Sequence, residues 1–178
     1  NFKEWVRDHY RSPLGQRIDD RFAVYFDWKT ATISHTIPDF PKMLRLGTSG
    51  IIAEIEEAMA ADSDEERNTT RRAFILALEG LGTYSRHLAA QAAYEAERES
   101  DPSRAAELRR LAEICSQVVV GPARTLDEAV NSVWITWVGL HMESTNAGLS
   151  MGRLDQWLQP YFEADMGKLE TLEQRRAY

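Results

Sequence analysis

The chain has 178 residues, 43% of them hydrophobic and 10% aromatic, so it is long enough to form one domain with a real core. Its 21 basic and 28 acidic residues give a net charge of −7, which argues against nucleic acid and anionic membranes as partners. The single cysteine, Cys115, excludes an internal disulfide framework and favours a reducing, cytoplasmic compartment.

From Pro38 onward the pattern is helical almost throughout, whereas residues 1–37 mix strand and helix signals. A short helix is expected from Asp39 to Leu46 and ends at Gly47, after which an apolar face continues to Met59. The capping box Ser63-x-x-Glu66 predicts the start of a long helix. The expected buried stripe of that helix consists of Phe74, Leu78, Leu81, Ser85 and Leu88.

Two further helices are expected in the middle of the chain. Asp101-Pro102 begins the first, and the segment Val118 to Pro122 is interpreted as an extended break. The capping box Thr125-x-x-Glu128 begins the second, which runs from Ala129 to about Met142 and is apolar on nearly every side. A helix without a polar face must be surrounded by protein, and this chain is too short to enclose it. A larger body is therefore expected.

Small polar residues and glycines fill the loop from Glu143 to Arg153, between that apolar helix and another expected from Leu154 to Phe162. Such residues let the backbone approach a ligand closely, so the loop is a candidate site and points to an enzyme. The last residues, Glu170 to Tyr178, begin a helix with the capping pattern Thr171-x-x-Gln174 and stop within about two turns. Because the chain also lacks an initial methionine, we interpret it as a segment of a longer polypeptide.

Several candidate functional residues allow two interpretations. The four histidines are too far apart for a metal-binding motif, so no metal site is predicted. Cys115 lies on the apolar side of its helix, which favours a buried structural thiol over a nucleophile. His35, in a polar turn, either donates a hydrogen bond to a substrate or caps neighbouring backbone. Arg153 and Asp155 form either a surface pair or a site in which a buried arginine holds loop carbonyls.

Four separate blocks of the sequence resemble glycyl radical enzymes, and they occur in the order expected of that family. The blocks are Ile37-Pro-Asp-Phe-Pro-Lys-Met-Leu-Arg-Leu-Gly through Glu56, Leu111 to Gln117, Pro122 to Ala129, and Glu143 to Tyr161 with Ser-Met-Gly-Arg-Leu-Asp-Gln-x-Leu-x-Pro-Tyr. The likeness is to the pyruvate formate-lyase-like domain, in particular to the branch with glycerol dehydratase, choline trimethylamine-lyase and the arylacetate decarboxylases. It covers residues from about 30 to 178.

The resemblance implies that residues 1–178 are part of a single pyruvate formate-lyase-like domain, truncated at both ends. This segment would be mostly α and would supply helices that wrap the ten-stranded α/β barrel of these enzymes. In the family, an activating enzyme that uses S-adenosylmethionine installs a glycyl radical, which generates a thiyl radical that abstracts hydrogen from substrate. The cysteine loop resembles Cys-x-Glu and the radical loop resembles Arg-Val-x-Gly-aromatic, and neither string occurs in this sequence. The resemblance thus predicts no catalytic residue here, no bound cofactor, and a fragment that is inactive alone.

The resemblance also suggests substrate-binding residues, namely His35, Ser144, Asn146 and Gly148. His35 matches the position of a substrate-contacting histidine in the glycerol dehydratase branch. Where those dehydratases resemble Glu-Ser-Asn-Gly-His-Ser-Ile-Ser-x-Gly-Arg, this chain has Ala147 in place of the histidine and Gly148 in place of the following, substrate-facing serine. This departure removes a hydrogen-bond donor and favours a bulkier or more apolar substrate than a diol. Ser150, Arg153 and Asp155 are expected to support the loop.

The sequence therefore predicts a fragment of a glycyl radical enzyme that catalyses radical elimination or decarboxylation of a small organic substrate. Its expected partners are that substrate, the activating enzyme, the remainder of the polypeptide and a second copy in a homodimer. Two alternatives stay open: a formate acetyltransferase of the pyruvate formate-lyase type, and a non-catalytic helical interaction or scaffold protein.

Overall fold

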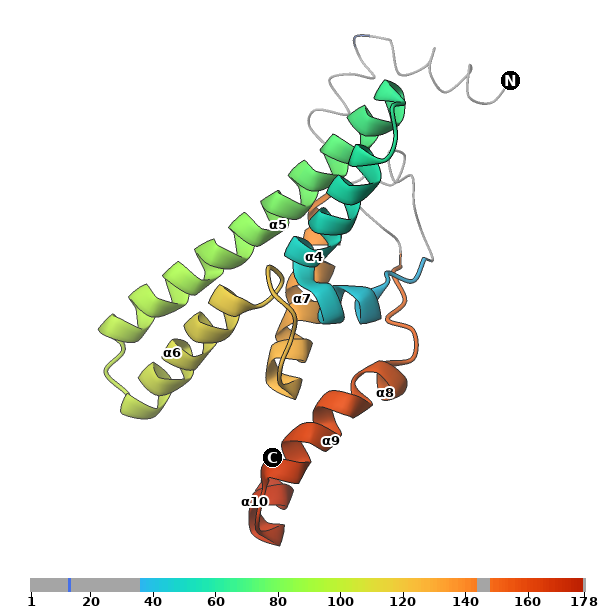
Figure 1. The fold of residues 1–178 in the computed structure, drawn as a ribbon. Coiled ribbons are helices and arrows are strands. Elements are labelled where there is room, and N and C mark those ends of the chain that lie inside the picture. Colours follow the sequence, from blue (N-terminus) through green and yellow to red (C-terminus); the bar gives the residue numbers. More distant parts are fainter. Residues whose placement is uncertain (1–12, 14–35, 144–147, 178) are drawn as a thin grey trace. The chain divides into compact units, whose positions relative to one another are not determined.

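The computed structural model describes Pro13, residues 36–143 and residues 148–177, and its described elements are helices joined by short connections (Figure 1). The helices are α4 (Phe40–Ala60), α5 (Glu65–Arg98), α6 (Pro102–Gln117), α7 (Leu126–Glu143), α8 (Leu154–Trp157), α9 (Gln159–Lys168) and α10 (Leu172–Ala177). The chain forms two compact units, Asn1–Ile37 with Leu140–Ser150, and Pro38–Gly139 with Met151–Tyr178. The prediction of a mostly α segment is confirmed.

Helix α4 begins and breaks where the sequence predicts. The Asp39 carboxylate accepts a hydrogen bond from Lys42 N at 3.0 Å and so caps the helix. Gly47 has φ 63° and ψ 179°, which interrupts the helical geometry. A positive φ strongly favours glycine because a side chain would clash with the backbone. The helix then resumes and runs to Ala60.

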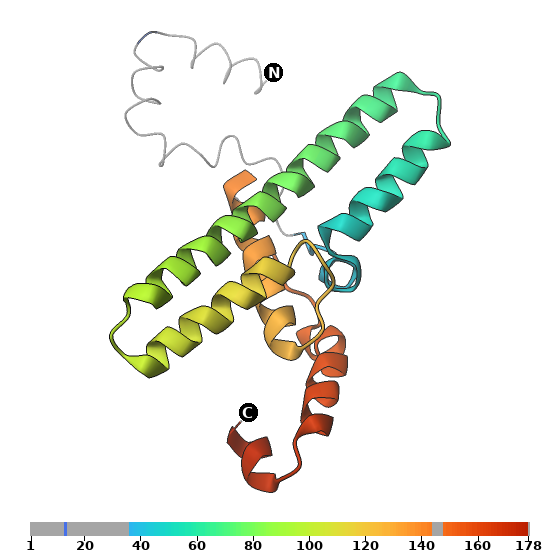
Figure 2. The same cartoon turned by 60° about the vertical axis from the view of Figure 1, so that its left-hand side comes forward.

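Helices α5 and α6 form an antiparallel hairpin, which both views of the ribbon show (Figures 1 and 2). The buried residues of α5 are all small or polar: Asn68, Gly82, Ser85, Ala92 and Ala96. From Gly82 onward they are spaced by three, seven and four residues, which keeps them on one face of the helix. Small side chains let a neighbouring backbone approach closely, so this face accommodates packed helices without large apolar residues.

Two predictions about α5 are wrong. The N-cap is Asp64, whose carboxylate accepts hydrogen bonds from Glu66 N at 3.0 Å and Arg67 N at 3.1 Å. The expected cap, Ser63, precedes it by one residue. Serine and aspartate both suit the N-cap position, and here the aspartate occupies it. Phe74, expected in the buried stripe, is 57% exposed. Ser85 is buried as predicted, because its hydroxyl donates to the carbonyls of Cys115 at 2.7 Å and Val118 at 3.1 Å.

The connection between α6 and α7 is a tight turn rather than the predicted extended break. Val118 and Gly121 form an isolated bridge, and Gly121 N donates to Gln117 O at 3.0 Å. Val119 has φ 55°, a left-handed conformation that is uncommon for a β-branched residue, and it is fully buried. Surrounding contacts must hold it there, since such a conformation costs about 1 to 3 kcal/mol.

Those contacts come from the break in α4. Thr48 N donates to Val119 O at 2.6 Å, and Ser49 donates to Val120 O through its backbone N–H at 3.1 Å and its hydroxyl at 2.7 Å. Because Gly47 leaves the helical geometry, the amides after it point to the turn instead of to carbonyls of α4. The break in α4 and the turn at residues 118–121 therefore satisfy each other's backbone groups.

The start of α7 confirms the predicted cap at Thr125 and adds two buried carboxylates. Thr125 Oγ1 accepts from Glu128 N at 3.1 Å, as a capping residue does. The Glu128 carboxylate does not accept from the Thr125 amide, as a capping box would have it. It accepts from the backbone N of Arg124 at 2.7 Å and from the Arg124 guanidinium at 2.6 Å. Burial alone would raise the pKa of Glu128, but the hydrogen bonds from Arg124 lower it below its ordinary value. Asp165 of α9 accepts from Leu126 N at 2.7 Å and so ties α9 to this helix end.

The apolar core has two clusters. One lies beneath the turn and includes Met43, Ile114, Cys115, Val118, Val119 and Ile135. The other surrounds Phe40, whose ring lies 6.4 Å from that of Trp137 and 5.7 Å from that of Trp157. Aromatic centroids at these separations are in the favourable range for ring contacts.

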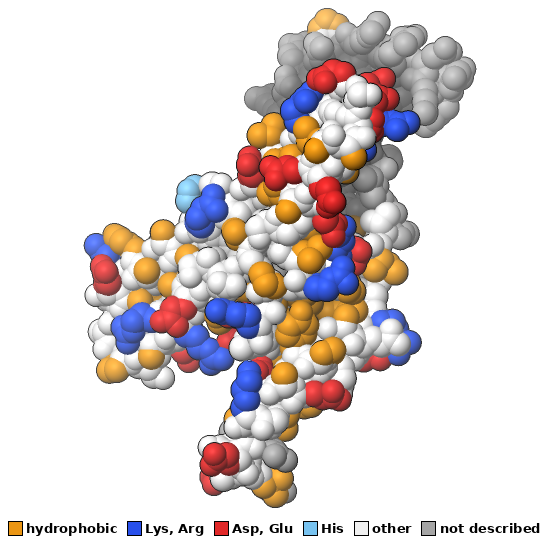
Figure 3. Space-filling view, viewed as in Figure 1, with side chains coloured by type: hydrophobic (Ala, Val, Ile, Leu, Met, Phe, Trp, Pro, Cys, Tyr) orange, Lys and Arg blue, Asp and Glu red, His pale blue; other side chains and the backbone are white. Residues whose placement is uncertain are grey.

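Part of the apolar helix α7 is left open. Val130 is 49% exposed and Trp134 is 61% exposed. More generally, hydrophobic side chains, coloured orange, lie among charged ones on the face of the molecule that Figure 3 shows. Exposed apolar residues one turn apart on a helix are typical of a surface that another protein segment covers. The expectation that this chain cannot enclose the helix is thus confirmed for these two residues.

The C-terminal helices differ from prediction in one respect. The single helix expected from Leu154 to Phe162 is two helices, α8 and α9, because Leu158 interrupts the first and Pro160 stands at the start of the second. The predicted cap of the last helix is confirmed. Gln174 Oε1 accepts from Thr171 N at 2.9 Å, and Gln174 N donates to Thr171 Oγ1 at 3.1 Å.

We predict that Gly47→Ala destabilises the protein by about 3 kcal/mol or more, because the new side chain would occupy a left-handed conformation against backbone. Its Cβ would lie 2.6 Å from the carbonyl carbon of Gly121 and would also meet the Val120 oxygen. Gly80→Ala is the matched control. A Cβ there meets nothing within 4 Å, so a gain of up to about 1 kcal/mol is expected. Urea unfolding measures both, and equal effects would contradict this account of the turn.

Candidate functional site

Two polar segments that are far apart in the sequence lie side by side. Thr36 pairs with Leu149 in a parallel bridge, and Ser150 N donates to Thr36 O at 3.0 Å. Both segments belong to the same compact unit. Thr36 directly follows His35, and Leu149 directly follows Gly148. The structure thus joins the ends of the two segments for which the sequence predicts substrate contacts.

The pairing is made by backbone groups, so it cannot be predicted from the residue types at Thr36 and Leu149. Ser150, expected to support the loop, takes part through its amide, and its side chain is exposed. Gly148 is half-buried. The sequence predicted both segments as parts of a candidate site but did not predict the role of Thr36. Only the fold shows which backbone carbonyl accepts from which amide.

Beyond the pairing the chain turns at Gly152. This residue has φ 69°, and Leu154 N donates to Gly152 O at 3.2 Å as α8 begins. A left-handed residue before a helix favours glycine, which accounts for one of the two glycines in the loop. The turn directs the backbone from the candidate site into α8.

Arg153 and Asp155 form a two-pronged ion pair at the start of α8. Arg153 Nε donates to one carboxylate oxygen at 2.9 Å, and a terminal guanidinium nitrogen donates to the other at 2.7 Å. The side chains are 68% and 65% exposed, which matches the surface pair rather than the buried arginine among the two interpretations. The hydrogen bond from Arg153 lowers the pKa of Asp155. A role of Ser150, Arg153 and Asp155 in supporting the loop stays a prediction.

Three of the predicted substrate-binding residues, His35, Ser144 and Asn146, lie outside the described residues. Their roles therefore stay predictions, as does that of Gly148. The chemistry that the described part of the site offers is a set of backbone groups beside a half-buried glycine.

Cys115 is a buried structural thiol. It is 4% exposed within the cluster beneath the turn, and burial raises its pKa above the ordinary value. A desolvated thiol is a poor nucleophile because the thiolate is the reactive form. The Ser-Gln that follows Cys115 also differs from the Cys-x-Glu string of the resemblance.

Neither a metal site nor a membrane span is found in residues 36–143 and 148–177. No group of three or more potential ligand side chains converges there. None of the described helices is sufficiently long and apolar to cross a bilayer.

Comparison with known proteins identifies the family. The family model described as pyruvate formate lyase-like matches residues 1–177. Isethionate sulfite-lyase of Nitratidesulfovibrio vulgaris is 33% identical over 166 residues, which are 89% of this chain and 20% of that protein. (2S)-3-sulfopropanediol dehydratase of Klebsiella oxytoca is 30% identical over 160 residues, 87% of this chain and 19% of that protein.

Solved structures give the same result. The glycerol-bound form of the B12-independent glycerol dehydratase from Clostridium butyricum matches with a TM-score of 0.74 and 30% identity, over 77% of this chain and 18% of that one. A glycyl radical enzyme from Archaeoglobus fulgidus matches with a TM-score of 0.72 and 27% identity, over 87% of this chain and 22% of that one. The chain thus spans about a fifth of the length of these proteins.

We predict that the Cys115 thiol of the folded protein resists alkylation by iodoacetamide near neutral pH and reacts readily once urea unfolds it. Because burial raises its pKa, folding favours the protonated thiol. Stability from this group is present below the ordinary pKa and declines as the pH rises through the folded value. Mass spectrometry of labelled protein measures the rate. Labelling as fast as that of a free thiol at pH 7 would contradict the assignment.

Proposed function

The chain belongs to the pyruvate formate lyase-like family, and we propose that it forms one part of the substrate pocket of a glycyl radical lyase. The reaction is the elimination of a leaving group from a small organic substrate, or its decarboxylation. The adjacency of Thr36 and Leu149 carries this proposal, because it supports a common pocket for the segments that contain His35 and Gly148.

The relatives favour a lyase over the alternatives. The matched proteins are named as a sulfite-lyase and dehydratases. These names favour an elimination reaction over the acetyl transfer of a formate acetyltransferase. A scaffold protein without chemistry is less consistent with a family match over residues 1–177. Exposed Val130 and Trp134 support a chain that works within a larger protein, whose remaining segments cover α7.

This chain's own part in the reaction is to bind and orient. No string here matches the radical cysteine or glycine loops, since Cys115 is followed by Ser-Gln and not by the x-Glu of the resemblance. Hydrogen abstraction therefore belongs to residues of the larger protein, after a separate activating enzyme has acted on it. His35 would donate a hydrogen bond to a substrate hydroxyl or carboxylate, and such a bond to a charged group contributes about 1.5 to 3 kcal/mol. A homodimer in the cytoplasm remains a prediction.

The substrate class follows from Gly148. At the position where the resembling dehydratases carry a substrate-facing serine, glycine offers no side-chain donor and leaves more room. A site that lacks a hydrogen-bond partner for a hydroxyl discriminates poorly in favour of a diol. We therefore propose a substrate other than glycerol, bulkier or more apolar on the side that meets Gly148.

The test uses the full-length protein, activated anaerobically and assayed with isethionate, 3-sulfopropanediol, glycerol and an arylacetate. His35→Leu is expected to lower kcat/KM at least about tenfold for the preferred substrate, because leucine cannot donate the hydrogen bond. Gly148→Ser is expected to shift the preference toward glycerol.

Two control variants separate these effects from general damage. His87→Leu changes a histidine exposed on α5, and Gly167→Ser changes a glycine whose Cβ would meet nothing within 4 Å. Both are expected to keep the activity and the preference. Equal activity of the His35 and His87 variants would remove His35 from the pocket. Absence of activity on every substrate tested, despite a formed glycyl radical, would contradict the proposed reaction class.

A further inference from the structure

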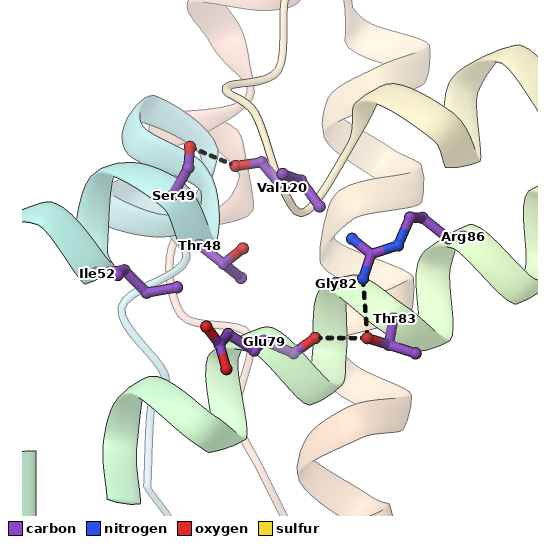
Figure 4. Close-up of a pocket in the computed structure, with 8 residues that line it drawn as sticks. All are labelled: Thr48, Ser49, Ile52, Glu79, Gly82, Thr83, Arg86 and Val120. Atoms are coloured by element: carbon purple, nitrogen blue, oxygen red, sulfur yellow. Dashed lines mark hydrogen bonds between the residues drawn. The ribbon is translucent and has the colours of Figure 1, made fainter. Parts of the chain in front are cut away.

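A cavity of about 390 Å³ lies where α4, α5 and the turn at residues 118–121 meet (Figure 4). Its volume is within the range of small-molecule sites, and its wall carries both hydroxyl and charged groups. It belongs to the compact unit that does not contain the Thr36–Leu149 pairing. Neither the sequence motifs nor the proposed function accounts for it.

The Thr48 hydroxyl is the first sign of a ligand. Thr48 is 2% exposed, and its amide is used by Val119 O, whereas no described residue hydrogen-bonds its hydroxyl. Figure 4 shows this hydroxyl directed into the cavity. Because the hydroxyl lies open to the cavity and has no protein partner, a ligand can bond to it in place of solvent.

The second sign is the guanidinium of Arg86, which faces the Thr48 hydroxyl across the cavity in Figure 4. One terminal nitrogen donates to Thr83 Oγ1 at 2.8 Å, and no carboxylate of the described residues forms an ion pair with Arg86. Space between them is left by Gly82. A Cβ on Gly82 would lie 3.5 Å from the other terminal nitrogen of Arg86 and 3.9 Å from Thr48 Oγ1. A ligand oxyanion that lies over Gly82 can direct one oxygen to each of these two donors.

The third sign is Glu79, which lines the same cavity two helical turns before Arg86. Its carboxylate likewise forms no ion pair with a described residue, and it does not bridge to Arg86 across the cavity. A negative charge here disfavours a ligand that is only anionic, and it favours one that also carries a positive group.

We propose that this cavity binds a small zwitterion, with its carboxylate or other oxyanion at Thr48 and Arg86 and its ammonium group at Glu79. Gly82 keeps the cavity open. Thr83 holds the Arg86 guanidinium in place, since its hydroxyl accepts from Arg86 and donates to Glu79 O at 3.0 Å. The site acts independently of the proposed lyase reaction and is detected by binding, not by turnover.

The test is calorimetric titration of the full-length protein with glycine, β-alanine and 4-aminobutyrate, and with acetate and methylammonium as half-ligands. At least one zwitterion is expected to bind about tenfold more tightly than either half-ligand, because only a zwitterion engages both charges. Arg86→Gln and Glu79→Gln are each expected to weaken that binding about tenfold.

Thr48→Val gives the sharpest readout. It removes a hydroxyl that has no protein partner at constant shape, so the ligand-free protein should unfold at about the same temperature while zwitterion affinity falls about fivefold. Thr70→Val is the control, because its exposed hydroxyl bonds to Glu66 O within α5, and it should leave affinity unchanged. No zwitterion binding, equal binding of acetate, or equal effects of the two threonine variants would each overturn the proposal.

Discussion

The contact between the break in α4 and the turn at residues 118–121 is the constraint on which the rest of the larger unit depends. Gly47 leaves the helix with a positive φ, and the amides of Thr48 and Ser49 then donate to the carbonyls of Val119 and Val120. These bonds hold Val119 in a conformation that it would otherwise avoid. Because the turn joins α6 to α7 and also packs beside α5, one contact fixes the arrangement of four helices.

That arrangement leaves one face of α7 open at Val130 and Trp134, whereas Asp165 and Glu128 hold the start of the helix firmly. A chain with a defined core and an uncovered apolar stripe is suited to act inside a larger protein. The relatives in the family are such larger proteins, since the chain spans about a fifth of their length. Under the proposed function, the pairing of Thr36 with Leu149 would form a wall of the pocket, and other parts of the larger protein would supply the radical chemistry.

The sequence predicted the helix caps and the helix break, because short-range interactions determine these features. The cap at Thr125, the box at Thr171 and the break at Gly47 each depend on residues within one turn of the helix, and all three are confirmed. The left-handed Val119 could not be foreseen, because hydrogen bonds from a distant helix impose it. The pairing of Thr36 was equally hidden, since backbone groups make it. Phe74 was misplaced because small residues, and not a large apolar stripe, form the packed face of α5.

The central claim is that the segments containing His35 and Gly148 line one substrate pocket. An experimental structure of the full-length protein with its substrate bound tests this most directly. The account predicts that the bound substrate contacts both the His35 side chain and the backbone at Gly148, with Thr36 and Leu149 paired beside them. A substrate bound elsewhere, in contact with neither segment, would contradict it.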